Sequence, residues 1–94
     1  MDQKEKTMKK RKITILGAGH VGTHCASSLM FRGLADEIVF IDTDVKKSES
    51  QALDLNDMGA CLTTKTIVRA GNYEDLEDSQ ILVNAVGRSR RPGE

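Results

Sequence analysis

Three glycines near the N-terminus are spaced as in a loop that binds the pyrophosphate of a dinucleotide. Gly17, Gly19 and Gly22 form a G-x-G-x-x-G string. In this pattern the first glycine permits a tight turn, the second lets the backbone approach the pyrophosphate, and the third lets a helix pack closely on the preceding strand. The helix then offers unpaired N–H groups and partial positive charge to the anion. The alternative is that the glycines serve only a close strand-to-helix turn.

A carboxylate follows at the distance that such a site requires. Asp42 lies 20 residues after Gly22 and directly after the apolar run 38–41. At this position a carboxylate accepts hydrogen bonds from the ribose hydroxyls of the adenosine half and repels a 2′-phosphate. Neither Thr43 nor Asp44 supplies the arginine that NADP would need, so the pattern favours NAD. For Asp42 alone, a turn-forming residue at a strand end is the competing interpretation.

Histidines and cysteines do not form a convincing metal or redox site. His20 and His24 have the spacing of two zinc ligands on one helix face, but no glutamate follows His20 and no third ligand is in view. We therefore predict no metal. Cys25 and Cys61 lack the C-x-x-C spacing, and we expect two reduced, largely buried thiols.

The elements that must position these residues alternate along the chain. Short apolar runs predict buried strands at 13–16, 38–41, 66–68 and 81–86, and apolar residues at helical spacing predict helices at 21–31 and 45–58. Gly33 is expected to end the first helix and Asp44 to cap the second, while 73–78 has room only for a turn or a short helix. The order β-α-β-α-β-β predicts an α/β fold, the N-terminal half of a Rossmann-type parallel sheet with about four strands and helices on its faces.

Length and charge exclude several other classes of protein. The chain has 94 residues, of which 38% are hydrophobic and 30% are charged, enough for one small core and not for two. Residues 1–12 carry six basic and two acidic groups, so we expect a basic flexible arm there and a partial dinucleotide-binding domain at 13–94. Basic groups at a chain end disfavour nucleic-acid binding. No apolar run has the length of a membrane span or the form of a signal peptide, and we expect a cytoplasmic protein.

The sequence resembles the NAD-dependent L-lactate and malate dehydrogenases over nearly all of 13–94. The resemblance is carried by GAGHVG at 17–22, GLADEIVFID at 33–42, ALDLN at 52–56, YEDL at 73–76 and PGE at 92–94. The glycine turn occurs in many folds, whereas the other strings in this order are much more selective. One departure concerns 85–87, where Ala-Val-Gly replaces the usual Thr-Ala-Gly and follows Asn84, an amide that we expect to be buried and in need of partners.

The resemblance implies where the cofactor would touch the chain. Val21 would contact the pyrophosphate through its backbone, and Lys47 and Tyr73 would border the adenosine. A solvated lysine and a packing tyrosine are equally open interpretations of these last two. The turn after the last strand would pass beside the nicotinamide-proximal half. The expected cofactor-binding residues are Gly17, Gly19, Val21, Gly22, Asp42, Lys47, Tyr73, Gly87 and Arg88.

Arg90 is the expected substrate residue, because it falls on the position that resembles the family's specificity residue. A guanidinium there would pair with the second carboxylate of malate or oxaloacetate, which a neutral amide cannot do. A solvated basic loop is the competing interpretation. The general base, its aspartate partner and the arginine that binds the substrate's 1-carboxylate would lie in a following domain. We therefore expect no catalytic residue within these 94 residues, which should bind NAD weakly and not turn over substrate.

The resulting hypothesis is the NAD-binding portion of an oxidoreductase that transfers hydride between NAD and an L-2-hydroxy acid, with malate favoured and L-lactate or a branched 2-hydroxy acid as alternatives. A different class of function, a non-catalytic NAD-sensing Rossmann module, is also compatible with the cofactor motif. The expected partners are a small 2-hydroxy or 2-oxo acid and further copies of the chain in a homodimer or homotetramer, with the helix at 45–58 as subunit contact. No nucleic acid or membrane partner is expected.

Overall fold

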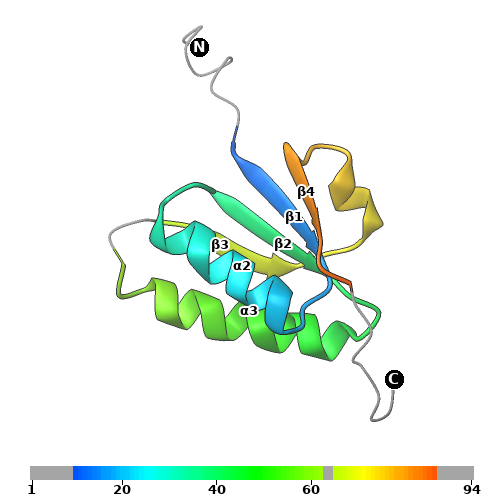
Figure 1. Ribbon diagram of the computed structural model, residues 1–94, viewed down its shortest axis with the longest axis horizontal. Coiled ribbons are helices and arrows are strands. Elements are labelled where there is room, and N and C mark those ends of the chain that lie inside the picture. Colours follow the sequence, from blue (N-terminus) through cyan, green and yellow to red (C-terminus); the bar gives the residue numbers. More distant parts are fainter. Residues whose placement is uncertain (1–9, 63–64, 87–94) are drawn as a thin grey trace, which may run out of the picture.

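Four short strands and two longer helices alternate in the computed structural model, which describes residues 10–62 and 65–86 (Figure 1). The strands and helices are β1 (Lys12–Leu16), α2 (His20–Phe31), β2 (Glu37–Ile41), α3 (Val45–Gly59), β3 (Ile67–Ala70), the 3-10 helix η1 (Tyr73–Leu76) and β4 (Ile81–Asn84). The two predicted helices are confirmed. Asp44 caps α3 through its side chain, and α2 ends at Phe31, two residues before Gly33, whose φ of 63° is the left-handed conformation typical of a helix stop.

The sheet is parallel throughout and has the strand order β3-β2-β1-β4. In its centre Ile15 of β1 lies between Phe40 of β2 and Val83 of β4. This order confirms the predicted Rossmann-type half sheet. Because all strands run the same way, their carboxyl ends meet at one edge, where a ligand site is expected in open α/β sheets.

Both α2 and α3 cover the same face of the sheet (Figure 1). Side chains alternate along a strand, so Ile13, Ile15, Ile38 and Phe40 share the face toward the helices. These side chains are almost completely buried. The helices complete the apolar core with Ala26 and Met30 from α2 and Ala52 and Leu55 from α3. Among the described residues, no helix has the length and hydropathy needed to cross a membrane.

On the opposite face, charged side chains take the place of an apolar helix. The segment 71–80 connects β3 to β4, and Lys12 donates to Asp75 at 3.2 Å and to Asp78 at 2.5 Å. Arg69 donates to Glu37 at 2.6 Å and to Asp75 at 2.5 Å. We call these five residues the polar clasp. It attaches the short connection to the strands of the sheet where there are too few residues for an apolar helix.

Lys12 and Asp75 of the polar clasp have pKa values shifted toward their charged forms. The guanidinium of Arg69 and the N–H of Asn72 hold the pKa of Asp75 well below its usual range, and Asp78 raises the pKa of Lys12. The Lys12 side chain is only 7% exposed. The prediction that Lys12 belongs to a flexible arm is therefore wrong, because β1 begins at Lys12, one residue before the predicted strand. Arg11 is also held, by Asp36, while residues 1–9 lie outside the described part of the chain.

The sequence predicts burial for Asn84 and for Cys61, and the structure shows both to be exposed. Asn84 ends β4 as an exposed residue and accepts a hydrogen bond from the Val86 N–H at 3.1 Å, so the fourth strand stops before 85–86 and the amide is not in the core. Cys61 is exposed beyond the end of α3, and Cys25 is half-buried. Burial at these positions depends on how the outer elements pack, which the local apolar pattern does not report.

Asn56 of α3 pairs with the outer edge of β3. Its Nδ2 donates to the Val68 carbonyl at 2.6 Å, and its Oδ1 accepts from the Val68 N–H at 2.9 Å. Val68 is 2% exposed, so water cannot replace these bonds easily. The amide therefore satisfies a backbone donor and acceptor that point away from β2, and it fastens α3 to the sheet.

Replacing Asn56 by leucine should lower the free energy of unfolding by about 2 kcal/mol or more, because two backbone groups of Val68 lose their partners at about 1–3 kcal/mol each. Urea denaturation measures this change. Asp57→Leu, at an exposed neighbouring position of α3, is the matched control and should change stability by less than about 0.5 kcal/mol. Equal losses in the two variants would contradict the role assigned to the Asn56 amide.

Candidate functional site

The carboxyl ends of β1, β2 and β4 and the segment that follows β3 enclose a cleft of about 340 Å³. It lies at the point where the strand order reverses, with β2 and β4 on either side of β1. Ligands of open parallel sheets bind at such a switch point. The residues that line the cleft are Leu16, Gly17, Gly19, Ile41, Asp42, Thr43, Lys47, Tyr73, Ala85 and Val86.

Five of the predicted cofactor residues meet in this cleft: Gly17, Gly19, Asp42, Lys47 and Tyr73. Val21 and Gly22 are not among its lining residues; both lie in the first turn of α2 beside it. Gly87 and Arg88, and the predicted substrate residue Arg90, lie outside the described residues. Motif reasoning missed Thr43, Ala85 and Val86, although each follows the end of a strand and the parallel order could have placed them at the same edge.

Gly17 and Gly22 are both required by the packing of the chain. Gly17 has a φ of 99°, and a Cβ there would lie 3.0 Å from the carbonyl carbon and oxygen of Ala85. A Cβ at Gly22 would overlap the Gly17 carbonyl oxygen. The first turn of α2 thus sits directly on the backbone of the glycine turn. The competing interpretation from sequence, glycines for a close turn, is sufficient for these two positions.

Gly19 is different, because nothing in the chain's packing excludes a side chain there. Its φ is −83°, an ordinary value, and the only described atom within 4 Å of the place that a Cβ would take is Lys47 Nζ, at 3.6 Å. The space above Gly19 belongs to the cleft. A small residue at this position leaves the backbone open to an approaching ligand, as the pyrophosphate pattern predicts.

The N-terminus of α2 is left without a side-chain cap and has no acidic residue in its first turn. The other two described helices are capped, α3 by Asp44, which accepts from the Lys47 N–H at 3.1 Å, and η1 by Asn72, which accepts from the Glu74 N–H at 3.0 Å. An uncapped helix start presents free N–H groups and partial positive charge. Because this start borders the cleft, it is suited to bind an anionic group such as a phosphate.

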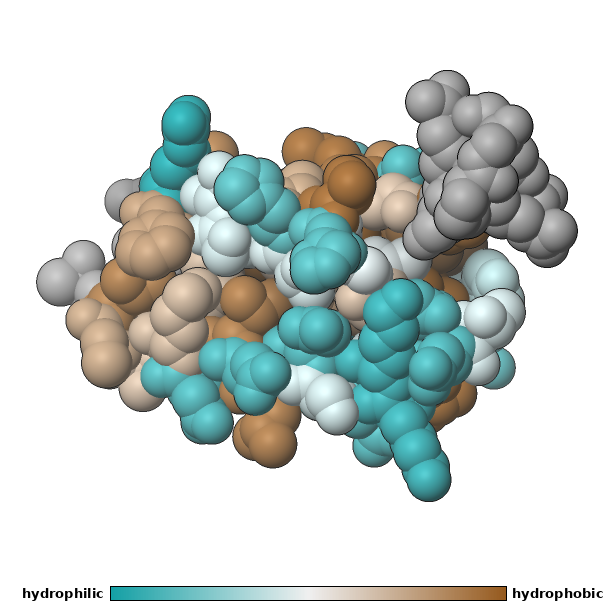
Figure 2. All heavy atoms as spheres, turned by 60° about the horizontal axis from the view of Figure 1, so that its bottom comes forward, coloured by the Kyte–Doolittle hydropathy of each residue, from teal (hydrophilic) through white to brown (hydrophobic). Residues whose placement is uncertain are grey.

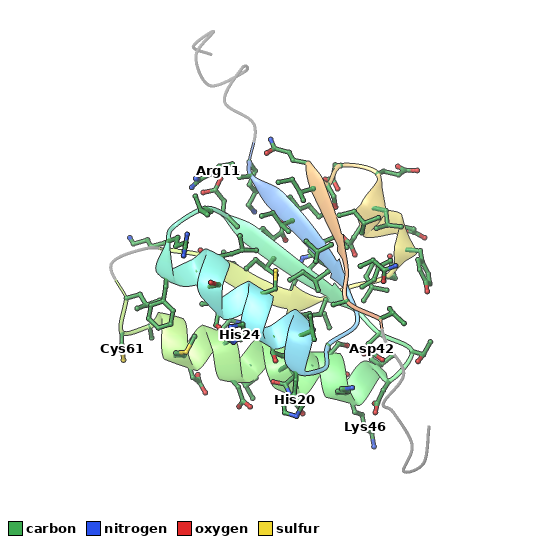
Figure 3. All side chains as sticks on the ribbon, viewed as in Figure 1. Arg11, His20, His24, Asp42, Lys46 and Cys61 are labelled. Carbon is green, nitrogen blue, oxygen red and sulfur yellow. The ribbon has the colours of Figure 1, made fainter. Side chains whose placement is uncertain are left out.

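Asp42 is oriented by two backbone N–H groups. Its Oδ2 accepts from Ala18 at 2.8 Å and its Oδ1 accepts from Asp44 at 2.9 Å. The hydrogen bond from Ala18 contributes most to lowering the pKa of Asp42, and that from Asp44 contributes next. The positive charge of Lys47 adds to the effect. Each carboxylate oxygen has more than one acceptor direction, so the pair can still accept hydroxyl donors from a ligand. Figure 3 shows Asp42 at the end of the sheet nearest the start of α2.

The two histidines lie on α2, His20 as its first residue and His24 one turn further along. His20 and His24 are exposed residues of α2, and Figure 3 shows them on the helical layer, with Cys61 at the far end of the molecule. Within residues 10–62 and 65–86, no three histidine, cysteine or acidic side chains are placed to hold a metal ion together. Viewed from the helical side, the surface carries hydrophilic side chains most densely toward one end (Figure 2).

Comparison with known proteins points to one family. Residues 11–94 match the family model described as lactate/malate dehydrogenase, NAD binding domain. The L-lactate dehydrogenase of Lactococcus lactis subsp. cremoris is 43% identical over 84 residues, 89% of this chain and 27% of that protein. The malate dehydrogenase of a Nitratiruptor species is 41% identical over 87 residues, 90% of this chain and 27% of that protein.

A solved structure agrees with the sequence comparisons. The minor L-lactate dehydrogenase from Enterococcus mundtii superposes with a TM-score of 0.85 at 36% identity, covering 90% of this chain and 27% of that one. The chain therefore spans about a quarter of the length of the relatives it matches.

Gly19→Ala and Gly22→Ala should separate ligand binding from folding. Alanine at Gly19 should leave the melting temperature almost unchanged and weaken NAD binding about tenfold or more, about 1.4 kcal/mol, because the methyl group enters the cleft. Alanine at Gly22 should cost about 1–3 kcal/mol of stability by displacing α2. Calorimetry gives both quantities. An unstable Gly19→Ala variant with undiminished NAD affinity would refute this distinction.

Proposed function

The chain belongs to the lactate/malate dehydrogenase family through its NAD-binding domain, and we propose that it binds NAD in the cleft at the carboxyl ends of β1, β2 and β4. The observation that carries the proposal is the uncapped start of α2 beside Gly19, the glycine that the chain's own packing does not require. Asp42 lies next to this start and is held there by the Ala18 N–H.

In the proposed complex each part of the cofactor meets a matching group. The pyrophosphate lies over Gly19 against the first N–H groups of α2, including that of Val21. The adenosine ribose donates its hydroxyls to Asp42. Lys47 and Tyr73 border the adenosine side of the cofactor, and Lys47 adds positive charge to the cleft. The nicotinamide half extends toward the end of β4, where the resemblance assigns Gly87 and Arg88.

Asp42 is also the proposed reason for a preference for NAD over NADP. Like any aspartate it is negatively charged at neutral pH, and the backbone N–H groups that it accepts from lower its pKa further. A 2′-phosphate in place of the ribose hydroxyl would bring like charges together and would lose the hydrogen bond to the carboxylate. Lys47 reduces this repulsion without removing it, because a single lysine cannot match the bidentate geometry of an arginine.

We further propose that this domain serves an enzyme that moves hydride between the nicotinamide and C2 of an L-2-hydroxy acid. The named relatives include lactate and malate dehydrogenases, which support the class of substrate and leave the choice open. Arg90 is the reason to favour a dicarboxylate such as malate, with lactate or a branched 2-hydroxy acid as alternatives. This proposal assigns neither the catalytic base nor the groups that bind the 1-carboxylate to any of residues 1–94. A cytoplasmic homodimer or homotetramer is part of the same proposal.

Titration calorimetry with NAD and NADP tests the cofactor proposal. The wild-type chain should bind NAD at least about tenfold more tightly than NADP, and Asp42→Ala should reduce this ratio to about threefold or less, mainly by weakening NAD, since one charged hydrogen-bond acceptor is worth about 1.5–3 kcal/mol. Asp57→Ala, an exposed carboxylate of α3 away from the cleft, is the control and should keep the ratio. Tighter binding of NADP by the wild type would reject the proposal.

The substrate proposal can be tested in a chimaera in which residues 11–94 replace the matching segment of the Lactococcus lactis L-lactate dehydrogenase. Arg90→Gln should lower kcat/KM for oxaloacetate relative to pyruvate by about 10–100-fold, because the second carboxylate loses a charged partner. Arg91→Gln serves as the control for general loss of positive charge. A preference for pyruvate that Arg90→Gln leaves unchanged would remove Arg90 from its role.

A further inference from the structure

Asp75 joins the segment after β3 to β1, whose Lys12 is 63 residues away in sequence, and to β3, whose Arg69 is only six residues away. Its Oδ1 accepts from Lys12 Nζ at 3.2 Å and from Arg69 Nη2 at 2.5 Å, so it is bonded to both β1 and β3. Its Oδ2 accepts from the Asn72 N–H at 3.0 Å. The carboxylate is 16% exposed, which limits competition from water. One side chain therefore joins the underside of the sheet to the segment that follows β3.

That segment leads directly into the cofactor cleft. Gly71 donates its N–H to the Phe40 carbonyl at 2.9 Å, and a side chain at Gly71 would overlap both Asp75 and Val39. Asn72 is bonded to Asp75 and in turn caps the start of η1. The backbone from 71 to 73 is thus fixed between the sheet and the Asp75 carboxylate.

Tyr73 is the first residue of η1 and lines the cleft. The residue is 67% exposed, so burial of the ring contributes little to holding it in place. The position of the ring depends instead on the backbone that carries it, and that backbone is bonded to Asp75 one residue away, at Asn72. Asp78 differs, because it shares Lys12 with Asp75 but is 77% exposed and makes no bond to 71–73.

We propose that Asp75 is a positioning residue of the cofactor site: by tying Asn72 to Lys12 and Arg69, it fixes Tyr73 as the wall of the cleft on the adenosine side. This inference rests on the proposed function for its binding consequence and on the contacts of Asp75 alone for its structural one. Asp75 belongs to the polar clasp, on the face of the sheet opposite α2 and α3, whereas the ligand would bind at the carboxyl ends of the strands.

The structural part is tested without any ligand, since Tyr73 is the only tyrosine and the chain has no tryptophan. Time-resolved anisotropy of tyrosine fluorescence therefore reports the mobility of this one ring. Asp75→Asn should give a larger fast component than the wild type, and Asp75→Ala a larger one still. Asp78→Asn, which removes a neighbouring partner of the same lysine, should resemble the wild type. Unchanged Tyr73 mobility in both Asp75 variants would overturn the inference, whatever the chain binds.

The binding part is tested with AMP and NAD by titration calorimetry on the same variants. Asp75→Asn should weaken both ligands about three- to tenfold, and Asp78→Asn should change them less than twofold. If Asp75 acts through Tyr73, the double variant Tyr73→Ala/Asp75→Asn should bind no more weakly than Tyr73→Ala alone. Additive losses would show a general effect on folding and overturn the inference. Absence of NAD binding by the wild-type chain would instead reject the proposed function, and the anisotropy experiment would still decide the role of Asp75.

Discussion

The close contact between the first turn of α2 and the backbone of Gly17 determines how the rest of the site is arranged. Because Gly22 has no Cβ, the helix can start directly over the Gly17 carbonyl, and Gly19 at its N-terminus lines the cleft. The same contact leaves Ala18 free to donate to Asp42, so β1, α2 and the end of β2 are joined within a few residues. A larger residue at Gly22 would separate the helix from the strand and displace the anion-binding end and the carboxylate together.

The two faces of the sheet are stabilised by different interactions, apolar burial on one and ion pairs on the other. The face under α2 and α3 buries aliphatic side chains, whose removal from water is favourable and insensitive to exact geometry. The opposite face uses the polar clasp, where a lysine that is 7% exposed needs two carboxylates in good geometry to offset its lost hydration. Such a network is more directional than an apolar contact. It fixes the path of the short connection that leads from β3 past the cleft to β4.

Local patterns were sufficient to predict those features that depend on neighbouring residues. The helix stop at Gly33, the cap at Asp44 and the turn at Gly17 depend on the chemistry of a few consecutive positions, and the order of strands and helices follows from apolar periodicity. Lys12 was misassigned because its partners, Asp75 and Asp78, lie more than 60 residues further along the chain. The spacing of Gly22 and Asp42 predicts a site where β1 and β2 end, at which the structure has a cleft, whereas placing Ala85 and Val86 in the lining of that cleft required the sheet order.

The side chain of Asn56 makes the two edges of the sheet different. Its amide occupies the hydrogen-bonding positions of Val68 that another strand would use, so it blocks strand addition at the β3 edge. Among the described residues β4 pairs with β1 alone, and no side chain of those residues is bonded to the backbone along its other edge in this way. Within residues 10–62 and 65–86, the backbone positions for a further strand are therefore open beside β4 and blocked beside β3, so two such sheets joined along β4 would form a closed pair and not a growing fibre.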